Sequence, residues 1–138
     1  MNDILDFFIN NWQLTGLFVL VLGAYLVFEY MQSSNSDTIS PEEAVLLINH
    51  EHGVVVDVRT PAEFGTGHIL HAINVDSNEA DDKFKKLNKY AKKPVILVCA
   101  HGKRSAQCLQ RMKAQGFERV FSLGGGMQAW KDAGLPLV

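Results

Sequence analysis

The chain has 138 residues, enough for about one domain, and its 15 acidic and 13 basic residues give a net charge of −2 at pH 7. This near-neutral charge argues against a nucleic-acid-binding protein, and two cysteines are too few for a disulfide-dense scaffold or a four-cysteine zinc site. Hydrophobic residues make up 47% of the chain, which excludes general disorder.

The N-terminal quarter is apolar and differs in composition from the rest. Phe7 to Phe28 is a run of 22 residues without a charge. As a helix this run is about 33 Å long, close to the thickness of a bilayer's hydrocarbon core. Trp12 stands near one end and Tyr25 and Tyr30 towards the other, where amphipathic rings favour the membrane interface. The segment therefore predicts a single transmembrane helix.

Two other interpretations of this segment stay open, a cleaved signal peptide and a buried helix of a soluble protein. Asp3 and Asp6 stand where a signal peptide carries basic residues, and the apolar run is long for such a peptide. We therefore favour an uncleaved anchor in an N-terminal region of residues 1–31. We expect its helix at about residues 8–30 and lipid contacts through residues 7–30.

The orientation and the partners of the helix are less constrained. No Lys or Arg flanks it closely, but a short acidic tail translocates readily, which favours a bacterial inner-membrane protein with its C-terminal domain in the cytoplasm. Gly16 and Gly23 lie near one helix face and would let a partner helix approach, although glycine is also common in membrane helices. Residues 32–37 are polar and predict a linker.

Residues 38–138 alternate short apolar strands with helices, without internal repeats. Ser40, Pro41 and Glu43 form the start signal of a helix that we expect to end at Gly53. This alternation predicts an α/β fold with a mainly parallel sheet covered on both faces. The expected strands are residues 54–58, 72–75, 94–98 and 120–123; the expected helices are residues 105–115 and 128–133 and a helical stripe of Phe84, Leu87 and Ala91.

Cys99 is the main candidate for chemistry. It follows a predicted strand directly, at the end where open α/β sheets place their sites. A tight loop containing Gly102 then leads into a helix, so backbone N–H groups and the helix dipole favour an anion there. Lys103 and Arg104 favour a thiolate over a thiol. Cys99 is therefore a candidate nucleophile with an anionic ligand, and the alternative is a buried structural cysteine.

Three motifs in residues 38–138 resemble those of the single-domain rhodaneses, a family of sulfurtransferases. The first, from Asp57 to Asn74, is D-V-R-T-P-A-E-F-G-T-G-H-I-L-H-A-I-N. The second, from Cys99 to Arg104, is C-A-H-G-K-R, and the third, from Gly116 to Trp130, is G-F-E-R-V-F-S-L-G-G-G-M-Q-A-W. Their order and spacing cover nearly the whole domain. The resemblance implies a mainly parallel five-stranded sheet flanked by helices, here preceded by the transmembrane helix.

The resemblance also implies sulfur transfer without a metal or an organic cofactor. Cys99 would attack a small-molecule sulfane sulfur donor, thiosulfate or a persulfide, and pass the sulfur from its own persulfide to a thiol or cyanide. Lys103 and Arg104 would attract an anionic donor through their side chains. The backbone amides that would stabilise the terminal sulfur belong to the loop residues Ala100, His101, Gly102, Lys103 and Arg104.

The sequence departs from the family pattern at two positions. Ala100 stands where an arginine is frequent, which lowers the expected affinity for a dianion such as thiosulfate. His71 stands where glycine is common, which bears on local packing.

Phosphatases and arsenate reductases of related fold place five residues between cysteine and arginine. Here four residues separate Cys99 from Arg104, which favours a single sulfur over a tetrahedral oxyanion.

Other polar groups near these motifs have structural interpretations. The resemblance makes Asp57 and Arg59 mainly a supporting ion pair at a strand end rather than an acid–base pair. Cys108 could resolve a Cys99 persulfide, but its helical spacing favours a packed thiol. The spacing of the histidines near Cys99, which are His68, His71 and His101, matches no standard metal site.

A lysine-rich stretch runs from Lys83 to Lys93. Such a stretch is commonly a solvated helix face, but in a tethered domain it could contact anionic lipid. This stretch and the two membrane glycines also keep a different function open, a membrane-tethered interaction module with little turnover. The intact Cys99 loop favours the enzyme.

Overall fold

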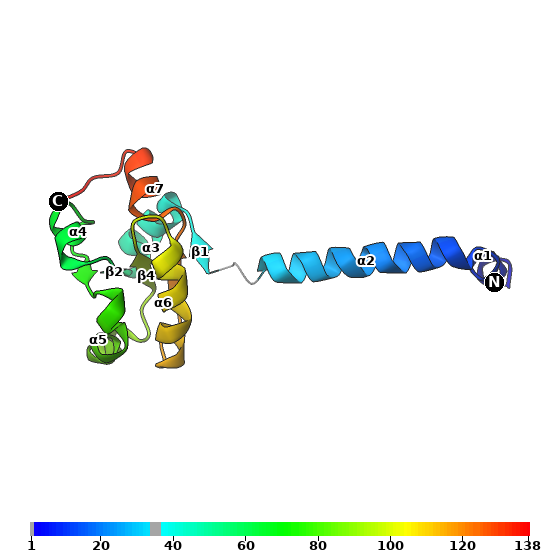
Figure 1. Ribbon diagram of the computed structural model, residues 1–138, viewed down its shortest axis with the longest axis horizontal. Coiled ribbons are helices and arrows are strands. Elements are labelled where there is room, and N and C mark those ends of the chain that lie inside the picture. Colours follow the sequence, from blue (N-terminus) through cyan, green and yellow to red (C-terminus); the bar gives the residue numbers. More distant parts are fainter. Residues whose placement is uncertain (1, 34–36) are drawn as a thin grey trace. The chain divides into compact units, whose positions relative to one another are not determined.

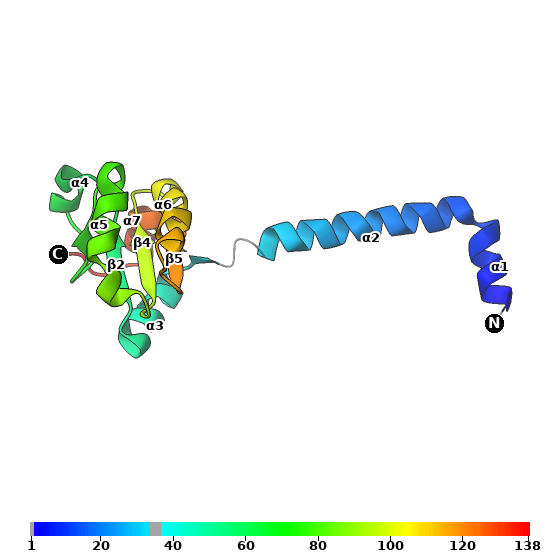
Figure 2. The ribbon, with the colours of Figure 1, turned by 90° about the horizontal axis from the view of Figure 1, so that it is seen from below.

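The computed structural model describes residues 2–33 and 37–138, which form two compact units divided between residues 36 and 37. The labels used below are those of Figures 1 and 2. The elements of the first unit are α1 (Asn2–Asn10) and α2 (Trp12–Ser33). Those of the second are β1 (Thr38–Ile39), α3 (Pro41–Glu51), β2 (Val54–Asp57), α4 (Pro61–Gly65), β3 (Ile73–Asn74), the 3₁₀ turn η1 (Ser77–Glu79), α5 (Ala80–Lys86), the 3₁₀ turn η2 (Asn88–Tyr90), β4 (Val95–Val98), α6 (Lys103–Ala114), β5 (Val120–Leu123) and α7 (Gly126–Asp132).

The apolar N-terminal segment forms two helices, α1 and α2, that meet at Asn11. This residue lies inside the helix expected at about residues 8–30, so that helix begins later than predicted. The Asn11 side-chain amide donates to the Phe7 carbonyl at 2.8 Å. The Thr15 hydroxyl lies 3.2 Å from the Phe8 carbonyl. Side-chain bonds of this kind compete with the backbone ladder and bend helices.

Within α2, Trp12–Met31 is long and apolar enough to cross a membrane. Its mean hydropathy is 1.8, and none of its hydrophobic window is buried in the structure. Length and composition alone support this, and a signal sequence meets the same criteria. The linker expected at residues 32–37 lies partly outside the described residues, which omit 34–36. Asp37 belongs to the second unit, because its carbonyl accepts the Ser122 N–H at 2.7 Å.

The second unit contains a five-stranded sheet in the order β1-β5-β4-β2-β3, with every pairing parallel. The predicted α/β fold with a mainly parallel sheet is confirmed, and Figure 2 shows β2, β4 and β5 together. The sequence reading gave no position for β1, because two residues at a sheet edge carry no periodic pattern.

Helices cover both faces of the sheet. Successive strand residues point to opposite faces, and the two core clusters follow this alternation. Val56 and Leu97 pack with residues of α5 and α6, and Ile96 packs on the other face with residues of α3 and α7. The central strands β2 and β4 are therefore almost entirely buried, which explains their continuous apolar sequences.

The start of α3 agrees with the sequence expectation, and its end differs. The predicted capping box of Ser40 and Glu43 is present at the start of α3. The left-handed residue at the other end of α3 is His52, with φ of 55°, and not Gly53. A Cβ at Gly53 would lie 3.1 Å from the Leu47 carbonyl group, so a larger residue there would require a small backbone shift.

The stripe of Phe84, Leu87 and Ala91 does not form one helix. α5 carries Phe84 and ends at Lys86, after which the chain continues through η2. Phe84 and Leu87 still face the core, because the tighter turn keeps their side chains on the same side.

Candidate active site

Cys99 lies at the carboxyl end of β4 and begins the loop into α6. The residue is only 1% exposed. The backbone N–H of Gly102 donates to Cys99 Sγ with an N···S distance of 3.0 Å. Gly102 has a φ of 94°, a conformation that favours glycine and that turns its N–H back towards the sulfur. A preorganised backbone donor at Sγ stabilises negative charge there.

The loop continues into α6, which starts at Lys103, two residues earlier than expected. The N–H groups of the first turn of a helix have no intrahelical acceptor, and Gly102 offers no side-chain cap. They form an electropositive end beside Cys99. The side chains of His101 and Lys103 are exposed, whereas Arg104 is half-buried.

Two buried serines lie beneath the loop, and the sequence reading missed both. Ser105 Oγ lies 3.5 Å from Cys99 Sγ and 2.7 Å from Ser122 Oγ. Because a hydroxyl donates to a thiolate or accepts from a thiol, Ser105 suits either form of Cys99. The signal that was available is the polar Ser122 inside the apolar strand β5.

The glycines after β5 bring α7 against the loop. The Met127 N–H donates to the Cys99 carbonyl at 2.8 Å, and the Gln128 N–H donates to the Ala100 carbonyl at 3.2 Å. A Cβ on Gly126 would lie 2.2 Å from the Cys99 carbonyl oxygen, so no larger residue fits there. The third motif therefore fixes the backbone of the second.

Arg104 forms an ion pair with Glu63 of α4. Its Nη1 and Nη2 donate to the two carboxylate oxygens of Glu63 at 3.0 and 2.9 Å. These bonds lower the pKa of Glu63 to about 2, and Glu63 raises the pKa of Arg104. The sequence reading treated Arg104 as a cation available to a donor. In the structure the guanidinium is paired with a carboxylate 41 positions away, which offsets part of the positive charge that Arg104 offers a donor.

Asp57 and Arg59 form a buried ion pair at the end of β2. Arg59 Nη2 lies 2.7 Å from Asp57 Oδ2 and also donates to the Gly67 carbonyl at 2.7 Å. Side chains buried in this way have no access to a substrate proton, so the arrangement is that of a brace. The adjacent Thr60 caps α4 by accepting the Glu63 N–H at 3.3 Å. The brace thus precedes the helix that presents Glu63 to the Cys99 loop.

The remaining candidates lie in structural positions. Cys108 lies on the buried face of α6 in the core, and burial raises the pKa of its thiol. His68 stacks on Phe64 with ring centroids 3.8 Å apart. Across residues 2–33 and 37–138, no group of three His, Cys, Asp or Glu side chains could hold a metal ion.

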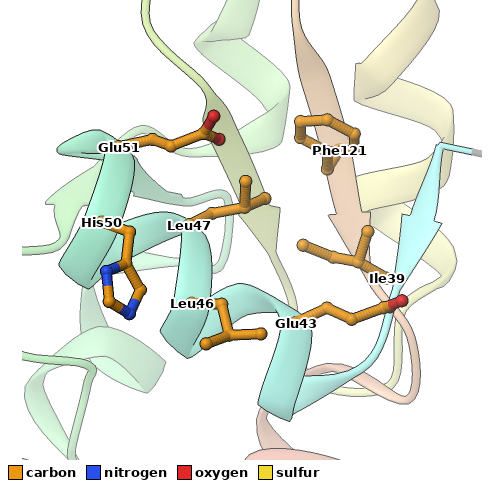
Figure 3. Close-up of a pocket in the computed structure, with 7 residues that line it drawn as sticks. All are labelled: Ile39, Glu43, Leu46, Leu47, His50, Glu51 and Phe121. Atoms are coloured by element: carbon orange, nitrogen blue, oxygen red, sulfur yellow. The ribbon is translucent and has the colours of Figure 1, made fainter.

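An open pocket of about 500 Å³ lies between α3 and the β1–β5 edge of the sheet (Figure 3). Leu47 and Phe121 face it from opposite sides. Its lining residues are Ile39, Glu43, Leu46, Leu47, His50, Glu51 and Phe121. None of these belongs to the Cys99 loop, so this pocket is separate from the candidate active site.

Comparison with known proteins agrees with this geometry. Residues 40–133 match the family described as "Rhodanese-like domain". Thiosulfate sulfurtransferase GlpE of Pseudomonas entomophila is 37% identical over 94 residues, which cover 68% of this chain and 84% of GlpE. A crystal structure of a rhodanese-related protein from Thermoplasma volcanium shares 34% identity and a TM-score of 0.64, covering 73% of this chain and 96% of that one.

One further relative extends over the N-terminal segment. The uncharacterized protein BU052 of Buchnera aphidicola is 32% identical over 140 residues, which cover 100% of this chain and 97% of BU052. The similarity therefore includes the apolar helices as well as the domain.

Proposed function

The chain belongs to the rhodanese-like family of sulfurtransferases, and on this basis we propose that it carries sulfane sulfur on Cys99. The observation that carries the proposal is the 3.0 Å bond from the Gly102 N–H to Cys99 Sγ at the start of α6. The neighbouring N–H groups of the first turn of α6 can stabilise a persulfide in the same way.

The proposed reaction has two displacements. The Cys99 thiolate attacks the outer sulfur of thiosulfate, and a new S–S bond forms between Cys99 Sγ and that sulfur. Sulfite leaves with the electron pair of the broken S–S bond, and Cys99 becomes a persulfide. A persulfide donor reacts in the same way and releases its thiolate. An acceptor thiolate or cyanide then attacks the outer sulfur of the Cys99 persulfide, and the Cys99 thiolate leaves. Cys99 is almost fully buried, so the donor has to present its sulfur at the tip of a slim group.

Mass spectrometry of the loaded protein tests the proposal. Wild type incubated with thiosulfate or with glutathione persulfide is expected to gain about 32 Da, one sulfur atom, and to lose it again to cyanide or a thiol. Cys99→Ser should gain nothing, whereas the matched variant Cys108→Ser should load like wild type. A folded wild type that loads with neither donor would contradict the proposal and favour the interaction module.

We also propose that Trp12–Met31 anchors the protein in a bacterial inner membrane as a single span, with the domain in the cytoplasm. Support comes from the length and hydropathy of the helix and from the acidic tail around Asp3 and Asp6. The reactive thiol of Cys99 favours a reducing compartment. Gly16 and Gly23 remain the proposed contact for a partner helix. Extraction of membranes at alkaline pH should leave the full chain in the pellet, whereas release into the supernatant would contradict anchoring.

A further inference from the structure

Five exposed lysines gather at the end of the domain opposite Cys99. We call this set the lysine edge, and it consists of Lys85, Lys86, Lys89, Lys92 and Lys93. All strands are parallel, so their N-terminal ends lie together on one side of the domain. Their C-terminal ends, including the one that Cys99 follows, lie on the opposite side. α5 runs from the end of β3 towards the start of β4, so its last turn and η2 lie on the side of the N-terminal ends.

Contacts confirm this placement. The Nζ atoms of Lys89 and Lys93 lie 5.0 and 5.6 Å from the centre of the Tyr90 ring. Tyr90 in turn lines a hollow together with His52 and Gly53, which directly precede β2. The ring of Tyr90 thus ties the lysines to the edge at which β2 and β4 begin.

The charge of this edge is largely uncompensated. In the part of the chain that the structure describes, no carboxylate lies within ion-pair distance of any of the five lysines. The nearby acidic residues Asp37 and Glu51 are paired with Lys113 and Arg119. Two acidic residues offset part of the charge: Asp81, which interacts electrostatically with Lys85, and Glu118, whose backbone N–H donates to the Ala91 carbonyl at 3.1 Å. The lysine edge therefore carries a net positive charge.

The chain also enters the domain from this side. Asp37 directly precedes β1, and its carboxylate pairs with Lys113 in the last turn of α6. α6 begins at the Cys99 loop, so its last turn lies at the opposite end of the domain. Five residues separate Met31 from Asp37, and the six Cα–Cα steps between them span at most about 22 Å when fully extended. In a chain anchored in a membrane through Trp12–Met31, this length is the upper limit on the distance between Asp37 and the end of the span.

We propose that the lysine edge binds the anionic lipid headgroups of that membrane, so that Cys99 is presented on the side of the domain away from the bilayer. The proposal rests on the proposed anchor for its biological setting, but the lipid binding itself does not need the anchor. A lysine close to an anionic surface strengthens association about fivefold. Two lysines together therefore strengthen the association about 25-fold. In the full chain, the tether also raises the effective concentration of lipid at the domain.

Vesicle co-sedimentation of residues 37–138 tests the proposal. This part has its own core, and a match to 73% of this chain accounts for 96% of the Thermoplasma volcanium chain. Wild type should bind phosphatidylglycerol vesicles and not phosphatidylcholine vesicles, and salt should weaken the binding. The double variant Lys92→Gln, Lys93→Gln should bind about 25-fold more weakly.

The matched control is Lys103→Gln, Lys131→Gln, which removes the same charge from other exposed positions and should bind like wild type. Equal loss in both variants would mean that only net charge matters and would overturn the lysine edge. Absence of vesicle binding, or lysine-dependent binding to RNA or an acidic protein alone, would overturn the lipid assignment. If only the proposed membrane span is wrong, residues 37–138 should still bind vesicles. The full chain should then be released from membranes by extraction at alkaline pH.

Discussion

The charge at the active-site loop is set by a few side chains. Lys103 is exposed, Arg104 is paired with Glu63, and Ala100 replaces an arginine that is frequent in the family. The loop therefore offers a dianionic donor less positive charge than its sequence suggests. A donor of lower charge, such as a persulfide, loses less from this arrangement than thiosulfate does.

Restoring the arginine should change donor preference. Ala100→Arg adds a cation near Cys99, which we expect to lower the KM for thiosulfate about fivefold, the equivalent of one exposed charge pair. The KM for glutathione persulfide should fall less. Steady-state kinetics with both donors measure the change, and an unchanged KM for thiosulfate would show that the side chain at position 100 does not reach the donor.

The pair of Glu63 and Arg104 predicts a pH-dependent part of the stability. The pKa of Glu63 is lowered to about 2 in the folded protein, so its contribution is full above the ordinary glutamate pKa of 4.5 and is lost as the pH falls through about 2. The pair is partly exposed, and we expect Glu63→Gln to cost at most about 1 kcal/mol at pH 6. Urea unfolding should show the two proteins converging below pH 4, and a gap independent of pH would contradict the ion pair.

His71 predicts a stabilising substitution. It is one of two non-glycine residues with positive φ in the described chain, with φ of 64°, where family members often have glycine. His71→Gly removes the steric cost of this conformation and should stabilise the domain by about 0.5–1 kcal/mol. His50→Gly, in the regular helix α3, is the control and should destabilise by a similar amount. A Tm that shifts in the same direction in His71→Gly and His50→Gly would refute the conformational argument.

At the scale of elements, Asn11 and Thr15 separate α1 from α2. Replacing them by Asn11→Leu and Thr15→Val should join the two helices, because the competing side-chain bonds are lost. Spin labels at positions 3 and 21, placed in a variant without native cysteines, would lie about 27 Å apart in a straight helix. The pulsed electron resonance distance should be shorter in the parent and approach that value in the double variant.

A label pair at positions 14 and 28 provides the control for this experiment. Both positions lie within α2, so their distance should be the same in the parent and the double variant. Equal distances between positions 3 and 21 in both proteins would show that Asn11 and Thr15 do not cause the break.

α4 is the element that connects the brace to the catalytic loop. The buried pair of Asp57 and Arg59 fixes the start of the segment, Thr60 caps the helix, and Glu63 then meets Arg104. Each of these residues comes from the first motif except Arg104. The motif therefore acts through structure, by holding one side of the Cys99 loop, rather than by contributing a reacting group.

At the scale of the whole molecule, the two units are expected to be independent. Both core clusters consist only of residues from Ile39 onwards, so the domain buries its apolar side chains without the N-terminal helices. Residues 37–138 alone should therefore load sulfur and unfold in one transition with an enthalpy of about 70 kcal/mol, the value for a domain of about 100 residues. Calorimetry and mass spectrometry measure both properties. Loss of either on removal of residues 1–36 would show that the units depend on each other.

The sequence by itself determined the alternation of buried strands and helices and the position of Cys99 at a strand end. These features rest on local patterns: continuous apolar runs such as Val95–Val98, and the capping signal at Ser40. Family motifs supplied the sheet of five strands. Such features depend on interactions between residues close in sequence, so the sequence alone is enough to predict them.

The tertiary structure alone decided what surrounds Cys99. Ser122, Glu63 and Gly126 reach the loop from β5, α4 and the start of α7, and no local pattern relates these positions to one another. The availability of Arg104 depends on a carboxylate that comes near only when the sheet brings the ends of β2 and β4 together. Contacts between distant segments depend on how the whole chain packs, because the burial of a side chain and the pairing of its charge are decided by the fold and not by residue type.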